Sequence, residues 1–243
     1  MLVAAAVCPH PPVLVPELAA GAAAELDGLR AACDTAVASL LEVEADLLLV
    51  VGDAAAVGPV AADAWGSFAP YGVDVPVGAG AGPPTLPLSL LVGRWLLERQ
   101  RRDLPPLLLF GVSADVDAER AAHLGATLAE REPRVALLAM GDASGRRTPK
   151  PGYLDERAEP YDEAVAAALR DGDPDALLRI DPALSAELLA QGRATWQVLA
   201  GAATGRDWVG DLTYADAPYG VCYLVATWRR ADPPDESAEP EAT

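Results

Sequence analysis

Short apolar runs that resemble β-strands alternate along this chain with alanine- and leucine-rich stretches of helical periodicity. The run at residues 45–52 is continuously apolar in its middle and ends in glycine, as expected of a central strand covered on both faces. Residues 17–41 instead place apolar side chains at the spacing of one helical face. This alternation predicts an α/β fold, a three-layer sandwich with a central, mostly parallel or mixed sheet and helices on both faces.

The same two patterns cover most of residues 1–230, which we expect to form a single domain. Glycine and proline residues crowd positions 65–87 and predict an irregular excursion, and the acidic residues 231–243 predict a disordered tail. Strands are expected at 2–7, 45–52, 107–112 and 134–140, with a closing hairpin of 207–214 and 219–228. Helices are expected at 17–41, 88–100, 117–130, 160–169 and 182–203.

The charge balance narrows the range of partners. The chain carries 36 acidic against 18 basic side chains, and this excess disfavours nucleic acid and anionic membrane surfaces. Three cysteines without a Cys-x-x-Cys spacing argue against a disulfide framework or a thiolate zinc site and favour a reducing, cytoplasmic setting. No apolar run approaches the roughly 20 residues of a membrane span. We therefore expect a small molecule or another protein chain as the partner, and neither nucleic acid nor a membrane.

A turn stiffened by prolines follows the first expected strand and carries His10 in the sequence Pro-His-Pro-Pro. Asp53 and Asp142 directly follow two further expected strands, and ligand sites in open α/β sheets gather at the carboxyl ends of the strands. His10 can serve such a pocket, or its imidazole can satisfy backbone groups of the turn. The two aspartates can hold a ligand, or they can form turns and helix N-caps.

Several motifs occur in an order that points to one family: Pro-His-Pro-Pro, the apolar run 48–52 with its loop, Met-Gly-Asp-Ala-Ser-Gly at 140–145, and Gln-Gly-Arg-Ala-Thr-Trp at 191–196. In this order the chain resembles the class III extradiol ring-cleavage dioxygenases of the B-subunit type. The last motif is similar to one in the related cell-motility mediator proteins, which share the fold. These anchors reach from about residue 2 to residue 228. The resemblance implies a non-haem Fe(II) site of two histidines and one carboxylate.

Most positions that match the family's functional residues hold other side chains. His10 matches the first ligand, but the loop that should carry the second histidine contains Ala55. Gly145 stands where the acid/base histidine is expected, and Gln191 where the mediator branch has a ligand cysteine. The resemblance therefore implies a protein that has lost ring cleavage. Such a protein keeps its cleft for a small, aromatic molecule, or for association with itself or with a second subunit.

The alternative is an active extradiol dioxygenase for a catechol-type substrate, with a rearranged metal site. In that site His10, Asp53 and Asp142 would hold a divalent iron, manganese or magnesium ion, and a set rich in carboxylates suits the harder ions of this group. The candidate pocket residues under both hypotheses are His10, Asp53, Asp142, Ser144, Gln191 and Arg193.

Other candidate residues have simpler structural roles open to them. His123 lies within a predicted helix, where a place on the helix surface is expected. Trp196 and Tyr219 can line an aromatic-binding cavity, although aromatic residues on helices and strands more often pack in the core. The basic residues among positions 146–150 can meet a carboxylate substrate, or they can form a solvated loop that pairs with acids such as Asp155.

Overall fold

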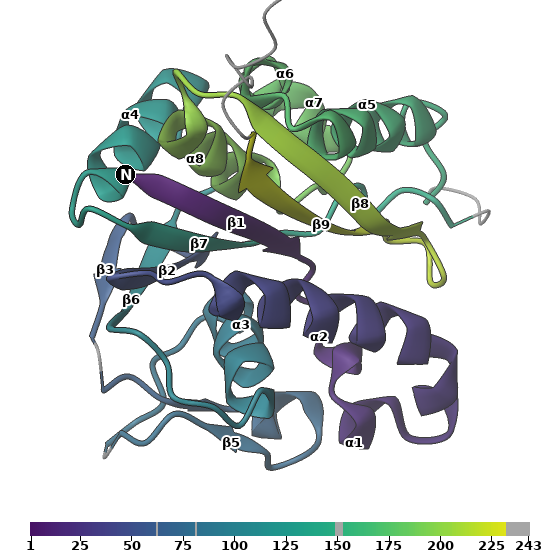
Figure 1. Ribbon diagram of the computed structural model, residues 1–243. Coiled ribbons are helices and arrows are strands. Elements are labelled where there is room, and N and C mark those ends of the chain that lie inside the picture. The colour runs from purple at the N-terminus through teal and green to yellow at the C-terminus, as the bar shows by residue number, and fades with distance from the viewer. Residues whose placement is uncertain (62, 81, 149–152, 232–243) are drawn as a thin grey trace, which may run out of the picture.

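The computed structural model describes residues 1–61, 63–80, 82–148 and 153–231, and it contains a seven-stranded sheet in the order β3-β6-β2-β7-β1-β9-β8 (Figure 1). The strands β6, β2, β7 and β1 run parallel, whereas β3 and the β9-β8 hairpin add antiparallel edges. The strands are β1 (Leu2–Cys8), β2 (Leu47–Asp53), β3 (Gly58–Val60), β6 (Leu107–Val112), β7 (Val135–Met140), β8 (Trp208–Asp216) and β9 (Tyr223–Arg230).

Helices cover both faces of this sheet, which confirms the predicted three-layer α/β fold (Figure 1). The layer on one face consists of α1 (Pro16–Ala19), α2 (Asp27–Glu42) and α3 (Leu88–Arg99). The layer on the other face consists of α4 (Ala118–Ala129), α5 (Ala158–Asp171), α6 (Pro174–Leu178), α7 (Pro182–Glu187) and α8 (Arg193–Ala203). A parallel sheet needs this double cover, since each of its strands presents apolar side chains in both directions.

Successive side chains of the central strands alternate between the two cores. In β1, Ala4, Ala6 and Cys8 pack with α2 and α3, whereas Ala5 and Val7 pack in the core that includes residues of α4, α5 and α8. This alternation follows from the two-residue repeat of a strand. All six residues of β7 are buried, as the continuous apolar run in the sequence required.

Two predicted helices are wrong in their extent. Residues 17–41 do not form one helix, because α1 ends at Ala19, a 3-10 segment Ala20–Leu26 follows, and α2 begins at Asp27. Residues 182–203 form α7 and α8 with a break between them, in which Leu189 adopts a left-handed φ of 59°. Both breaks lie in alanine- and leucine-rich sequence, where propensity alone favours an uninterrupted helix.

Tertiary hydrogen bonds account for the break between α7 and α8. The backbone N–H of Gly145 donates to the carbonyl of Leu188, and the N–H of Gly192 donates to the carbonyl of Asp142. These two bonds attach the linker to the segment that follows β7. A continuous helix would have committed the same backbone groups to its own ladder, so the docked loop replaces the predicted helical turn.

The excursion at residues 65–87 contains more regular structure than the sequence predicted. The short strands β4 (Gly66–Ser67) and β5 (Pro76–Val77) pair antiparallel, and a 3-10 turn, Ala69–Tyr71, lies between them. The sequence pattern also did not predict β3, which pairs with β6 and contains Pro59. A proline is tolerated there because β3 lies at the edge of the sheet.

The structure tests the predicted tail and domain boundary only in part. The expected acidic tail at 231–243 lies outside the described residues apart from Ala231, and the single domain over 1–230 stays a prediction. Within the described ranges, no helix combines the length and the apolar composition needed to cross a bilayer.

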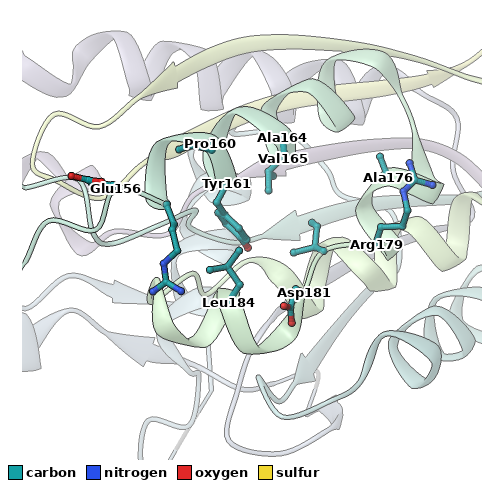
Figure 2. A pocket seen from close by; sticks show the side chains of 11 residues that line it. Glu156, Pro160, Tyr161, Ala164, Val165, Ala176, Arg179, Asp181 and Leu184 are labelled. Carbon is teal, nitrogen blue, oxygen red and sulfur yellow. The ribbon is translucent and has the colours of Figure 1, made fainter.

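The second helical layer is hollowed between α5, α6 and α7, where a cavity of about 720 Å³ opens (Figure 2). Tyr161 points from α5 towards Leu184 on α7, so that the two side chains meet across the hollow. Ala176 and Arg179 lie at the end formed by α6. We call this feature the α5–α7 groove.

The packing of α4 against α8 depends on small residues. A side-chain carbon on Gly125 of α4 would overlap the carbonyl oxygen of Val198 in α8, and one on Gly201 would overlap the carbonyl oxygen of Ala122. The two backbones therefore approach each other through glycines, and no flexible side chain is present that could move aside.

We predict opposite effects of Gly→Ala at two helical glycines. Gly125→Ala should lower the free energy of unfolding by about 1–3 kcal/mol, because the added methyl group forces α4 away from α8. Gly28→Ala, the matched control, meets no atom within 4 Å on the exposed side of α2, and it should raise the free energy of unfolding by up to about 1 kcal/mol. Urea unfolding of both variants measures the difference. Equal stabilities would contradict the close packing of α4 on α8.

Candidate functional site

The carboxyl ends of three neighbouring parallel strands meet at one edge of the sheet. The pairing of β7 with both β1 and β2 brings together the residues that end or follow these strands. His10 follows β1, Asp53 ends β2 and Asp142 follows β7. The sequence predicted that each of these residues follows a strand, and the sheet order places β7 between the other two strands.

His10 is buried, with 2% of its surface exposed. Its backbone N–H donates to Oδ1 of Asp142 over 2.8 Å, and its ring Nε2 lies 3.2 Å from Oε1 of Gln191. Because an amide oxygen only accepts hydrogen bonds, this contact is a hydrogen bond when Nε2 carries a proton. The other ring nitrogen, Nδ1, has no hydrogen-bond partner among the described residues and lies 3.7 Å from Oδ1 of Asp142.

Asp142 connects the turn after β1 to the start of α8. Its carboxylate accepts the N–H of His10, while its backbone carbonyl accepts the N–H of Gly192. Gln191 immediately precedes that glycine and closes the connection through the imidazole of His10. The candidate residues His10, Asp142 and Gln191 are thus brought together by direct hydrogen bonds.

Asp53 lies at the same edge but makes no hydrogen bond to these three residues that the structure records. Its backbone carbonyl accepts a hydrogen bond of 2.6 Å from Oγ of Ser89. Partial burial raises the pKa of the Asp53 carboxyl, and the positive charge that His10 can carry acts in the opposite direction. The carboxylate of Asp53 therefore lies within electrostatic range of His10, and no ion pair between the two is recorded.

The residues at this edge do not fit the iron site that the family resemblance implies. Among the described residues, no group of three or more histidine, cysteine, aspartate or glutamate side chains is arranged to hold a metal ion. The Nε2 atom of His10 is hydrogen-bonded to Gln191, and Asp142 accepts the backbone N–H of His10. The side chains of His10, Asp53 and Asp142 share an edge of the sheet without forming a ligand set.

Ser144 takes part in a separate buried network. Its N–H and its hydroxyl donate to the two carboxylate oxygens of Asp162 over 2.8 and 2.7 Å, and Nη1 of Arg147 donates to the same carboxylate over 3.2 Å. The pKa of Asp162 is raised, because the effect of burial exceeds the opposite effect of the hydrogen bonds from Ser144 and Arg147.

Sequence reasoning missed Asp162, although a signal was present. Asp162 stands four residues after Ala158 and three before Val165, and both of those side chains are buried on α5. The helical repeat thus placed a carboxylate on the apolar face of the helix. A buried acid requires hydrogen-bond donors, and Ser144 and Arg147 supply them.

Arg193 is buried at the start of α8 and holds the loop after β6. Its guanidinium donates to the carbonyls of Ala114 and Val116, and also to Oε1 of Gln197 over 3.0 Å. Burial lowers the pKa of this guanidinium. The hydrogen bonds of Arg193 therefore go to a structural loop rather than to His10, which separates it from the other candidate pocket residues.

The remaining candidates take structural positions. His123 is exposed on α4, as the sequence predicted. Trp196 is completely buried in the core, and its Nε1 has no hydrogen-bond partner among the described residues. Tyr219 is 43% exposed and donates its hydroxyl proton to Glu25 over 2.8 Å. Trp196 and Tyr219 thus lie in different environments, one in the core and one at the surface.

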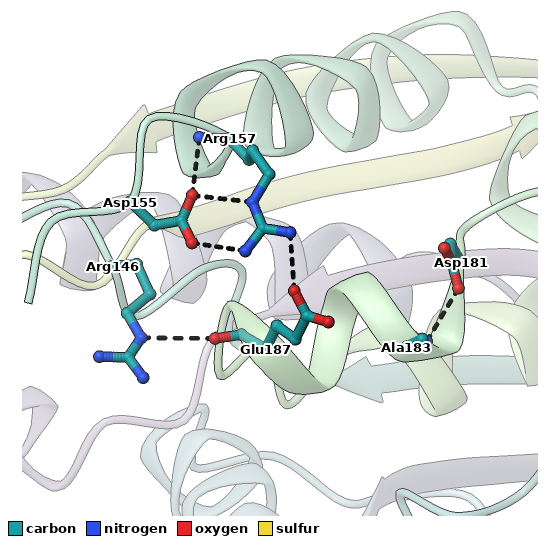
Figure 3. Close-up of polar contacts among 6 residues, drawn as sticks. All are labelled: Arg146, Asp155, Arg157, Asp181, Ala183 and Glu187. Atoms are coloured by element: carbon teal, nitrogen blue, oxygen red, sulfur yellow. Dashed lines mark hydrogen bonds and ion pairs between the residues drawn. The ribbon is translucent and has the colours of Figure 1, made fainter.

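The basic segment after β7 contacts acidic residues and the backbone of α7. Arg147 pairs with Glu159 and Asp162, and Lys150 lies outside the described residues. Nε of Arg146 donates to the backbone carbonyl of Glu187 over 3.4 Å (Figure 3). Asp155 forms an ion pair with Arg157, and the charge of Arg146 also lowers the pKa of Asp155.

Comparisons with known proteins add information about the fold. No family model and no curated protein matches the chain. The chain is similar to the crystal structure of the uncharacterized protein JW3007 from Escherichia coli K12, with a TM-score of 0.53 and 13% sequence identity. The similarity covers 93% of this chain and 99% of that chain. At this identity the comparison shows a shared fold.

We predict that Asp53→Asn stabilises the protein at neutral pH. A folded-state pKa above the ordinary value of 3.8 means that stability is greatest below that value and declines as the pH rises through the raised folded pKa. The uncharged amide avoids this loss, so its advantage at pH 7 should shrink below about pH 4. The midpoints of urea unfolding at pH 7 and at a pH below about 4 measure the effect. The exposed Asp103→Asn is the control. Destabilisation at pH 7 would instead reveal a favourable ion pair of Asp53.

Proposed function

We propose that this protein belongs to the group that resembles the B-type subunits of extradiol dioxygenases and has lost ring cleavage. In this proposal it keeps the fold, and the region around the strand ends, for small-molecule binding or subunit association. The observation that carries the proposal is the hydrogen-bonded arrangement of His10, Asp142 and Gln191. The one histidine at the expected position holds two segments together, and its Nε2 is occupied by an amide oxygen.

The chemistry of ring cleavage supports the same conclusion. Extradiol cleavage at a non-haem iron uses two imidazoles and a carboxylate, with open positions for catechol and dioxygen. The only histidine besides His10 is His123, which is exposed on α4. A second imidazole is therefore missing from the edge of the sheet that carries His10.

The position of the expected acid/base histidine is also altered. Gly145 donates its N–H to Leu188, and a side-chain carbon at this glycine would lie 3.3 Å from Cβ of Leu189. An aliphatic side chain thus packs where the family's proton-transfer group would begin. Loss of that group removes the general acid or base on which such a reaction depends.

One observation favours the alternative of an active enzyme with a rearranged site. Nδ1 of His10 is buried without a hydrogen-bond partner among the described residues, and Asp53 and Asp142 lie at the same edge of the sheet. An unpartnered imidazole nitrogen is a good metal ligand. The alternative therefore predicts that a metal binds in a way that depends on His10.

Metal content and oxygen consumption distinguish the two functions. We expect protein purified without chelator to hold no stoichiometric iron or manganese. After anaerobic loading with Fe(II), it should consume no more oxygen with catechol or protocatechuate than the same concentration of Fe(II) does without protein. The reason is that it lacks the second imidazole. Near-stoichiometric metal that disappears in His10→Ala but persists in His123→Ala would overturn the proposal, as would catechol-dependent oxygen uptake.

The structural role of His10 gives a positive prediction. Gln191→Ala should lower the free energy of unfolding by about 1–2 kcal/mol, because it leaves the buried Nε2 of His10 without its partner. His10→Ala should lower it by at least as much, because it removes a buried side chain, whereas the exposed amide of Gln191 can then bind water. The double variant should cost less than the two single variants together, by at least about 0.5 kcal/mol. His123→Ala combined with Gln191→Ala is the matched control and should be additive. Additivity in the His10 pair as well would show that the contact contributes nothing to stability.

A further inference from the structure

The α5–α7 groove has walls of apolar side chains and lies in the helical layer rather than at the strand ends (Figure 2). Its volume of about 720 Å³ falls within the range of roughly 300–1,000 Å³ that is typical of small-molecule sites. The apolar residues that matter below are Tyr161, Ala164, Val165, Ala176, Ile180 and Leu184.

The polar groups at the base of the groove satisfy one another. Oγ of Ser185 donates to the backbone carbonyl of Asp181 over 2.7 Å, so the hydroxyl of Tyr161, 3.0 Å away, donates its proton to that Oγ. Burial raises the pKa of Tyr161 to about 12, which keeps the phenol neutral. With its proton committed, Tyr161 presents mainly its ring to the groove. The floor of the groove therefore favours contact with an apolar part of a ligand over contact with a polar part.

One end of the groove is braced by an ion-pair network (Figure 3). Arg157 binds Asp155 and Glu187, with a distance of 2.7 Å to each carboxylate, and so joins the start of α5 to the end of α7. Hydrogen bonds from Arg157 lower the pKa of Asp155 to about 2. The pair of Asp155 and Arg157 therefore stays ionised at any physiological pH, and Arg157 contacts two carboxylates.

At the opposite end of the groove lies Arg179, whose positive charge is less fully compensated by nearby carboxylates than that of Arg157. The side chain of Arg179 is 70% exposed, and its guanidinium lies 3.8 Å from Asp173, near the limit of an ion pair. Asp181 also borders this end, but its carboxylate accepts the N–H of Ala183 as the N-cap of α7. The favourable field at a helix N-terminus offsets part of that negative charge. Arg179 is thus the rim group best placed to meet an anion.

From these features we propose that the α5–α7 groove binds an amphipathic monocarboxylate. Its apolar body packs between Val165 and Leu184, and its carboxylate pairs with Arg179. Eleven residues line the groove, whereas a stable protein interface uses roughly 20–30 residues on each side, so a small molecule fits better than a second chain. The net charge of −18 repels a polyanion far more than a ligand of single charge. This proposal does not depend on the function of the His10 site.

Calorimetric titration with octanoate and with 1-octanol separates the contribution of the carboxylate from that of the apolar body. The wild-type protein should bind octanoate more tightly than octanol. Arg179→Gln should weaken octanoate binding about three- to tenfold and leave octanol binding unchanged, because only the head group loses its partner. The exposed Arg102→Gln removes the same charge elsewhere and should change neither affinity.

A second pair of variants tests the apolar part of the groove. Ala164 is exposed on α5 and lines the groove, so Ala164→Trp should fill the space and abolish binding of both ligands while the helical circular dichroism is kept. Ala126→Trp on the exposed side of α4 is the matched control and should bind both ligands normally. His10→Ala should also leave octanoate binding unchanged, which separates this proposal from the preceding one.

Several results would overturn the proposal. These are the absence of octanoate binding, equal affinity for octanol and octanoate, octanoate affinity that Arg179→Gln leaves unchanged, or octanoate binding that survives Ala164→Trp. Loss of binding in folded His10→Ala would place the ligand at the strand ends instead. Sedimentation that shows a wild-type dimer which Ala164→Trp dissociates would assign the groove to a second copy of the chain.

Discussion

The parallel pairing of β6, β2, β7 and β1 is the constraint on which the rest of the molecule depends. Strands in such a sheet are buried on both faces, so polar side chains are excluded from their middles and appear where the strands end. Because the register is parallel, these ends coincide at one edge. His10, Asp53 and Asp142 meet there as a direct result, whether or not they share a function.

Burial has turned several of the candidate site residues into structural connections. His10 is bound by Asp142 and Gln191, Ser144 by Asp162, and Arg193 by the loop after β6. Each bond satisfies a polar group that would otherwise be costly to bury. The same bonds compete with any ligand for these atoms, which is why the edge resembles a metal site in its sequence but not in its geometry.

The helical layer behaves differently. Around the α5–α7 groove, Tyr161 and Ser185 satisfy each other and Arg157 is neutralised by Asp155 and Glu187, so the groove combines an apolar interior with the exposed charge of Arg179. Such a surface is suited to recognising an apolar body and one anionic group. The two regions therefore carry separate hypotheses about binding, and the variants at His10 and Arg179 test them independently.

The sequence by itself determined the layers of the fold, because two-residue and helical repeats report burial locally. It predicted the central strands and placed His10, Asp53 and Asp142 just after three of them. It could not show the break between α7 and α8, the edge strand β3 or the bond from Ser144 to Asp162. Each of these depends on partners distant in sequence, such as the N–H of Gly192 and the carbonyl of Asp142. Only the tertiary structure decided which polar atoms are already bound, since that depends on distances which no repeat encodes.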